Sequence, residues 1–241
     1  MIPLRDDTPR VHFPVAVLLV ITANVGLHVY LSGLPPWARE GVMHILGVVP
    51  ARYLLPDWAA AQGFPAMGAL PFLSYMFLHS GWWHLIMNMW MLWIFADNIE
   101  DVMGPGRFLA FYVLCGLAAL ALHLVFNLAA TVPIIGASGA IAGVMGGYVV
   151  LYPRGRVLTF IPILIIPYVV SLPAWVFLGF WFLTQVLSGL LGAISAEAQG
   201  IAWWAHVGGF LAGMLLVRLF MRPERCYHCD YKGFRKDFRF S

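Results

Sequence analysis

Four polar side chains in an otherwise apolar chain carry groups that can do chemistry. Ser138 carries a hydroxyl and Asn88 carries an amide. His84 and His206 carry imidazoles. A serine beside a histidine supplies the nucleophile and the general base of acyl transfer, and nearby N–H donors can stabilise the oxyanion that forms. No acidic residue lies near His206 in sequence, so we predict a Ser138–His206 dyad and not a triad.

The composition of the chain is that of an all-α polytopic membrane protein. Of its 241 residues, 61% are hydrophobic and 10% are charged, whereas a soluble domain has about 25% charged residues. The chain therefore has too few polar groups to cover a soluble surface. A hydrocarbon core about 30 Å thick needs about 20 apolar residues in a helix. Six segments meet or approach this length: 13–33, 83–103, 107–129, 138–152, 173–193 and 202–221.

Two connecting segments are rich in proline. Residues 34–80 contain six prolines and several aromatic residues, which predicts a long outer loop with short helical pieces at the membrane interface. Residues 157–172 are apolar but contain Pro162 and Pro167. We interpret this segment as an interfacial or re-entrant connector, and the alternative is an additional span.

The basic residues predict the orientation of the chain. With six spans, both ends lie on one side, and that side carries all 14 Lys and Arg residues except Arg39 and Arg52. Cytoplasmic loops carry an excess of Lys and Arg, so both termini are expected to be cytoplasmic. We expect a cytoplasmic N-terminal tail at 1–12, a membrane domain at 13–221 and a basic cytoplasmic C-terminal tail at 222–241. The short tails and the lack of a transit peptide favour a bacterial inner membrane.

This orientation places the four polar residues at similar depth. The second, fourth and sixth predicted helices all enter from the outer side, so their N-terminal residues lie in the outer half of the membrane. His84 and Asn88 are four residues apart and share a helix face. Ser138 begins its helix, where free backbone N–H groups and the helix dipole favour a developing negative charge. The predicted oxyanion site thus consists of His84, Asn88 and the helix start at Ser138.

Glycine spacing predicts that the fourth and sixth helices pack closely. Gly139, Gly143 and Gly147 recur every four residues, and so do Gly209 and Gly213. Small residues at this spacing let helix backbones approach each other in membranes. Close approach of these helices would bring Ser138 to His206.

Three short motifs carry these residues: His84-Leu85-Ile86-Met87-Asn88, Gly136-Ala137-Ser138-Gly139 and Ala205-His206-Val207-Gly208-Gly209. In this order, on the second, fourth and sixth predicted helices, they resemble the rhomboid family of intramembrane serine proteases over about residues 70–220. The resemblance implies a six-helix rhomboid-type bundle that hydrolyses peptide bonds in or near transmembrane segments of membrane-protein substrates. It implies Ser138 as nucleophile, His206 as base, and His84 and Asn88 as donors to the oxyanion, with no cofactor and no metal.

The resemblance also assigns structural roles. It implies a structural role for His79 and a structural hydrogen-bonding role for Glu100. Some family members carry an aromatic residue four positions after the serine, which packs on the histidine ring. This chain has Ala142 there, so we expect Trp203 or Trp204 to orient His206.

Two other functions stay open, together with the role of one tail motif. The chain could be a catalytically inactive rhomboid-like protein that binds membrane clients, or a small transporter or channel. We expect transmembrane proteins and the lipid bilayer as partners and no nucleic acid, and the oligomeric state is open. Cys226-Tyr227-His228-Cys229 is half of a zinc-like site, and the alternative is a basic tail that meets anionic head groups.

Overall fold

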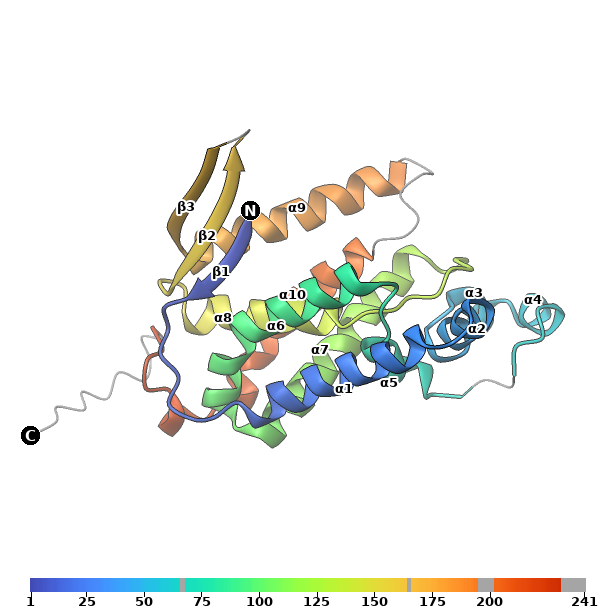
Figure 1. Ribbon diagram of the computed structural model, residues 1–241, viewed down its shortest axis with the longest axis horizontal. Coiled ribbons are helices and arrows are strands. Elements are labelled where there is room, and N and C mark those ends of the chain that lie inside the picture. Colours follow the sequence, from blue (N-terminus) through green and yellow to red (C-terminus); the bar gives the residue numbers. More distant parts are fainter. Residues whose placement is uncertain (66–67, 164–165, 195–201, 231–241) are drawn as a thin grey trace, which may run out of the picture.

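The computed structural model describes residues 1–65, 68–163, 166–194 and 202–230 (Figure 1). A long or apolar helix lies at each of the six positions that the sequence predicts as a span. These helices are α1 (Val15–Ser32), α6 (Trp82–Met103), α7 (Pro105–Phe126), α8 (Ser138–Leu151), α9 (Ala174–Ile194) and α10 (Trp203–Phe220).

Four of these helices, α1, α7, α9 and α10, are long and apolar enough to cross a membrane. Helix α8 has 14 residues, about 21 Å at 1.5 Å per residue, and is shorter than the hydrocarbon core. Helix α6 has 22 residues but carries more polar side chains. The described chain is therefore a helical membrane protein with several spans, and the count of six stays a prediction.

Helix α8 is enclosed by the rest of the bundle. Its residues from Gly139 to Tyr148 are all buried. Helices α10, α7 and α6 pack against it, and α9 touches it. Because its neighbours cover α8, a helix too short to span the membrane alone can still hold Ser138 at its first position.

The close approach of α8 and α10 depends on glycine, as the spacing predicted. A methyl group added at Gly209 would overlap the backbone carbonyl of Gly139, and one at Gly213 would overlap the carbonyl of Gly143. A methyl at Gly146 would meet the carbonyl of Phe210. These are contacts with backbone atoms, which cannot rotate away as a side chain can.

Gly209→Ala is expected to destabilise the protein by about 1–3 kcal/mol or more, because overpacking forces the two backbones apart. The thermal unfolding midpoint in detergent micelles measures this loss. Gly179→Ala is the matched control, since Gly179 lies in α9 with no atom near the added methyl. An equal midpoint for the two variants would contradict the proposed backbone contact.

The described residues between α1 and α6 contain four short helices, and each begins with a proline. They are α2 (Pro36–Leu46), α3 (Pro50–Leu54), α4 (Pro56–Ala61) and α5 (Pro71–Ser74), and a 3₁₀ turn follows at Tyr75–Phe77. Proline at the first helical position loses no intrahelical hydrogen bond. The expected short helical pieces are thus present, and α2–α4 gather at one end of the bundle (Figure 1).

The N-terminal residues are not the tail that the sequence predicted. Strand β1 (Ile2–Asp6) pairs antiparallel with β2 (Arg156–Ile163), and Ile2 lies opposite Phe160. Alternation over five residues with one proline is too short a signal to predict a strand whose partner lies 150 residues away. The segment 1–12 is therefore part of the folded domain.

The connector at 157–172 is a β-hairpin. Strand β3 (Ile166–Pro173) pairs antiparallel with β2, and Pro162 lies opposite Pro167. The sheet order is β1-β2-β3. Proline has no N–H to donate, and here the two prolines face each other across the hairpin. The alternative of an additional helical span is wrong for this segment.

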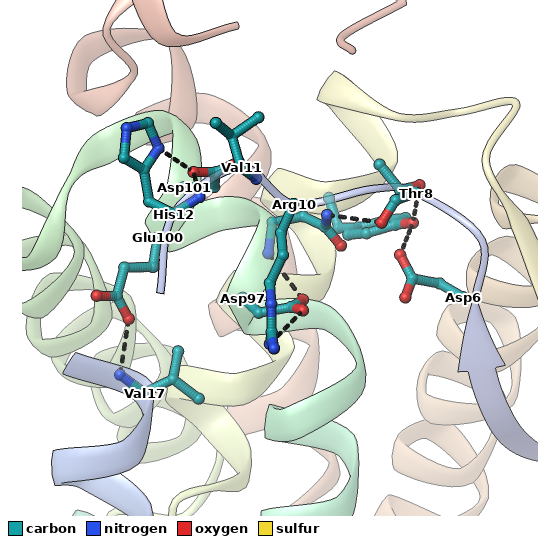
Figure 2. Close-up of polar contacts among 11 residues, drawn as sticks. Asp6, Thr8, Arg10, Val11, His12, Val17, Asp97, Glu100 and Asp101 are labelled. Carbon is teal, nitrogen blue, oxygen red and sulfur yellow. Dashed lines mark hydrogen bonds and ion pairs between the residues drawn. The ribbon is translucent and has the colours of Figure 1, made fainter. Parts of the chain in front are cut away.

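After β1, the chain crosses the C-terminal end of α6 and enters α1 (Figure 2). The carboxylate of Asp101 accepts hydrogen bonds from the backbone N–H groups of Val11 and His12 at 2.7 and 2.9 Å. Glu100 accepts from Ala16 and Val17, at the start of α1, at 2.9 and 2.8 Å. A carboxylate at this position satisfies free N–H groups and interacts with the helix dipole. The structural role expected of Glu100 is thus visible in its contacts.

Residues 222–230 fold back onto the ends of α6 and α8. The backbone N–H of Arg222 donates to Val102, and that of Asp230 donates to Leu151. Cys226 and Cys229 form a disulfide, so their sulfur atoms are not arranged as a half zinc site. Among the residues that the structure describes, no group of three His, Cys, Asp or Glu side chains could hold a metal ion. Residues 231–241 of the expected tail lie outside the described residues.

Candidate active site

Ser138 and His206 meet between α8 and α10. Ser138 is the first residue of α8, and His206 lies in the first turn of α10. Their side chains are joined by a hydrogen bond of 2.8 Å between Ser138 Oγ and His206 Nε2. The two residues that the sequence singled out as nucleophile and base are therefore in direct contact.

Gln185 holds the other side of the His206 ring. Its Oε1 lies 2.8 Å from His206 Nδ1, and its Nε2 donates to the Trp181 carbonyl and to Thr184 Oγ1. An amide oxygen can only accept, so Nδ1 carries the ring proton and Nε2 is free to accept from Ser138. Gln185 thus fixes both the tautomer and the orientation of His206.

The sequence did not assign this role to Gln185.

The two tryptophans expected to orient His206 behave differently. Trp203 lies edge-on to the imidazole at 6.1 Å between ring centroids, whereas Trp204 stacks on Phe126 at 4.1 Å. The expectation that Trp204 orients His206 is therefore wrong. For Gln185, the signal in the sequence was a single glutamine inside an apolar helix, but the sequence did not indicate His206 as its partner.

Asn88 lies on α6. It lines the same cavity as Ser138 and His206. Its Nδ2 is buried and, within the described part of the chain, has no hydrogen-bond partner. Leaving a buried donor unpaired is costly, so this amide is prepared to donate to a group that enters the cavity.

His84 lies one helical turn before Asn88 and faces Ser138 across Gly136. The backbone N–H of Ser80 donates to His84 Nδ1 at 3.4 Å, and Ser80 Oγ lies 3.1 Å from the same atom. This leaves the ring proton on Nε2, where it can be donated. His84 itself is not part of the cavity lining that includes Asn88, Ser138 and His206.

Gly136 separates His84 from Ser138. Its φ angle is +124°, in a region that side chains rarely adopt. A methyl group there would lie 2.9 Å from His84 Nε2 and 3.7 Å from Ser138 Oγ. Glycine in the Gly-x-Ser-Gly motif therefore keeps open the space between the hydroxyl and the imidazole donor.

The cavity has a volume of about 220 Å³. Its polar groups are Asn88, Ser138 and His206, and the rest of its wall is apolar: Met1, Pro3, Met87, Met91, Ile141, Met145, Phe177 and Trp181. An apolar pocket with a few polar groups is typical of a site that fixes one reacting group.

Three other histidines, His28, His79 and His123, are buried and do not line the cavity. His79 packs edge-on against His84 at 5.0 Å and lies 6.4 Å from His28 between ring centroids. His123 lies on α7, and its carbonyl accepts a hydrogen bond from Asn127 at 2.9 Å. These contacts agree with the structural role expected of His79.

The fold and the site together define a mostly helical membrane protein of several spans with a half-buried Ser–His pair. A family model described as the rhomboid domain matches residues 68–223 of the chain. The chain belongs to the rhomboid family.

Curated relatives agree with this assignment. Rhomboid protein 1, mitochondrial, of Saccharomyces cerevisiae is 32% identical over 150 residues, which cover 58% of this chain and 38% of that protein. Presenilin-associated rhomboid-like protein, mitochondrial, of Mus musculus is 32% identical over 61% of this chain and 37% of its own length. Rhomboid protease GluP of Bacillus subtilis is 32% identical over 61% of this chain and 29% of its own length. The matched part thus spans less than two fifths of each of these relatives.

Proposed function

We propose that this chain is an intramembrane serine endopeptidase that hydrolyses peptide bonds in or near the transmembrane segments of membrane-protein substrates. The observation that carries this proposal is the 2.8 Å contact between Ser138 Oγ and His206 Nε2. Family membership supports it, and one relative is itself named a protease.

The first half of the reaction forms an acyl-enzyme. His206 Nε2 takes the proton of the Ser138 hydroxyl while Oγ attacks the substrate carbonyl carbon. The carbonyl oxygen becomes an oxyanion, which the Asn88 amide, the His84 Nε2–H and the free N–H groups at the start of α8 stabilise. Protonated His206 then gives its proton to the leaving amine, and the C–N bond breaks.

The second half restores the enzyme. Water enters the cavity, His206 removes one of its protons, and the resulting hydroxide attacks the ester carbon. The same donors stabilise the second oxyanion. The ester bond breaks, Ser138 recovers its proton from His206, and the carboxylic acid product leaves. Gln185 acts throughout by keeping the His206 proton on Nδ1.

The sequence predicted both termini in the cytoplasm. We propose that the start of α1 and the end of α10 lie on the cytoplasmic side, which the distribution of Lys and Arg supports, whereas Met1 itself lies in the active-site cavity. The bacterial inner membrane expected from the sequence is not supported, because relatives from yeast and mouse carry mitochondrial names. We therefore propose an orientation and leave the membrane itself unnamed.

Cleavage of a model transmembrane substrate tests the proposed function. The purified chain and the substrate are reconstituted together in lipid vesicles, and product is followed on gels, beside Ser138→Ala. The proposal expects cleavage by the wild-type chain and none by the variant. Substrate that binds but is never cleaved would instead favour the inactive, client-binding alternative.

Gln185→Leu is expected to lower kcat and leave KM nearly unchanged. The variant leaves the Nδ1–H of His206 without its acceptor, a loss of about 1–3 kcal/mol, which corresponds to about 5- to 150-fold in rate. Steady-state cleavage kinetics measure this effect. Gln185→Glu keeps an oxygen acceptor and should recover most of the rate, whereas a purely structural role for Gln185 would not separate the two variants.

A further inference from the structure

Strand β1 reaches into the active-site cavity. Met1 and Pro3 line the cavity together with Ser138 and His206. β1 packs against α6, and Phe177 and Trp181 of α9 belong to the same cavity wall. The first strand of the chain therefore occupies the side of the site that lies between α6 and α9.

The contacts of β1 in this place are made mainly to its backbone. The indole Nε1–H of Trp90 donates to the Pro3 carbonyl at 2.7 Å. On its other side β1 pairs with β2, with Ile2 opposite Phe160 and Arg5 opposite Leu158. Any extended chain offers such carbonyl and N–H groups, so this seat, formed by Trp90 and the edge of β2, recognises extended backbone and not one sequence.

The side chains of β1 are covered unequally. Ile2 and Leu4 are 40% and 37% exposed, whereas Pro3 is buried. An unpaired edge of β2 would leave backbone N–H and C=O groups without partners, at a cost of several kcal/mol each wherever water does not reach them. The seat is therefore more stable when β1 or another extended segment occupies it than when it is empty.

Polar contacts of Asp6, the last residue of β1, and of Thr8 hold β1 in the seat (Figure 2). The Tyr148 hydroxyl donates to Asp6 at 2.7 Å and lies 2.7 Å from Thr8 Oγ1. Asn98 Nδ2 donates to the Thr8 carbonyl at 3.1 Å. Burial raises the pKa of the Asp6 carboxyl, because desolvation outweighs the hydrogen bond from Tyr148. The hydrogen bond between Asp6 and Tyr148 thus holds β1 in place although burial of the Asp6 carboxyl is unfavourable.

We propose that the β1 seat is the docking surface for an extended, apolar segment of the transmembrane substrate, which replaces β1 at the edge of β2 during cleavage. This inference rests on the proposed function. A substrate carbonyl must reach Ser138 through a cavity of about 220 Å³ that Met1 and Pro3 partly wall. The substrate residues next to that carbonyl then form backbone hydrogen bonds at the position that β1 now occupies.

A disulfide between β1 and β2 tests the exchange. Ile2 and Phe160 are register partners before the shift of register that lies between Pro3 and Arg5. Paired residues of antiparallel strands lie about 4.5–5.5 Å apart at Cα, within the range that a disulfide bridges. The Ile2→Cys/Phe160→Cys chain is assayed oxidised and reduced with a model transmembrane substrate and with a small fluorophosphonate probe. Wild type receives the same reductant, because the native Cys226–Cys229 disulfide is also reduced.

The oxidised variant is expected to label with the probe but to cleave the transmembrane substrate at least tenfold more slowly, and reduction should restore cleavage. Labelling with equal cleavage in both states would overturn the exchange and leave the proposed function intact. Absence of labelling and cleavage in wild type would instead overturn the proposed function.

Asp6→Ala gives a second measurement that needs no disulfide. Weaker anchoring raises the fraction of molecules with an open seat, so kcat/KM for the transmembrane substrate should rise about three- to tenfold, with probe labelling unchanged. Asp57→Ala is the control, since Asp57 is exposed on α4. A fall in kcat/KM for Asp6→Ala would overturn the proposal.

Discussion

His206→Ala is expected to lower kcat for substrate cleavage by about 10⁴-fold or more, the size of loss seen when one member of a nucleophile–base pair is removed. The reason is the contact at Ser138: without Nε2 at 2.8 Å, no group takes the hydroxyl proton. The Asn88 and His84 donors remain but have no developing charge to stabilise. Cleavage in vesicles, followed to low conversion over long times, measures the residual rate.

His123→Ala is the matched control for this prediction. It removes another histidine inside the bundle, and His123 lies on α7 and is not part of the cavity lining. Its kcat should stay within a few-fold of wild type at equal folded fraction. If His206→Ala kept more than a tenth of the wild-type rate, another base would have to serve Ser138.

Asn88→Leu is expected to lower kcat by about 10²–10³-fold with little change in KM, the usual cost of losing one oxyanion donor. The unpartnered Nδ2 of Asn88 has no structural bond to lose. Leucine keeps a similar volume, so the cavity wall stays filled. The variant should therefore fold as well as wild type or better, because a buried unpaired donor is removed.

Steady-state kinetics and thermal midpoints of Asn88→Leu separate chemistry from folding. Asn24→Leu serves as the control, since Asn24 is buried on α1 and its Nδ2 donates to the Val20 carbonyl. That variant removes a buried asparagine outside the site and should keep its kcat per folded molecule. An unchanged kcat for Asn88→Leu would remove Asn88 from the oxyanion site.

The sequence predicted the helices well because apolar runs and prolines are local signals. The predicted helix at 138–152 is observed as Ser138–Leu151. The glycine spacing correctly indicated which two helices approach, because only hydrogen side chains fit against the carbonyls of Gly139 and Gly143. This packing is what allowed the Ser138–His206 contact to be predicted from residue types and depth.

The parts that the sequence missed depend on contacts between distant segments. Strand β1 needs a partner at 156–163, and nothing within residues 1–12 indicates it. Gln185 was visible as a polar residue in an apolar helix, but its partner, His206, is 21 residues away. The choice between Trp203 and Trp204 depended on the rotation of α10 about its axis, which its largely apolar sequence does not define.

The most direct test of the central claim is the site of covalent labelling by a fluorophosphonate. The activated Oγ should displace fluoride from the probe, and peptide mass spectrometry should find one phosphonyl group on Ser138. Labelling should fall to background in His206→Ala and be absent in Ser138→Ala. An adduct on any other residue, or equal labelling of wild type and His206→Ala, would contradict a Ser138 nucleophile activated by His206.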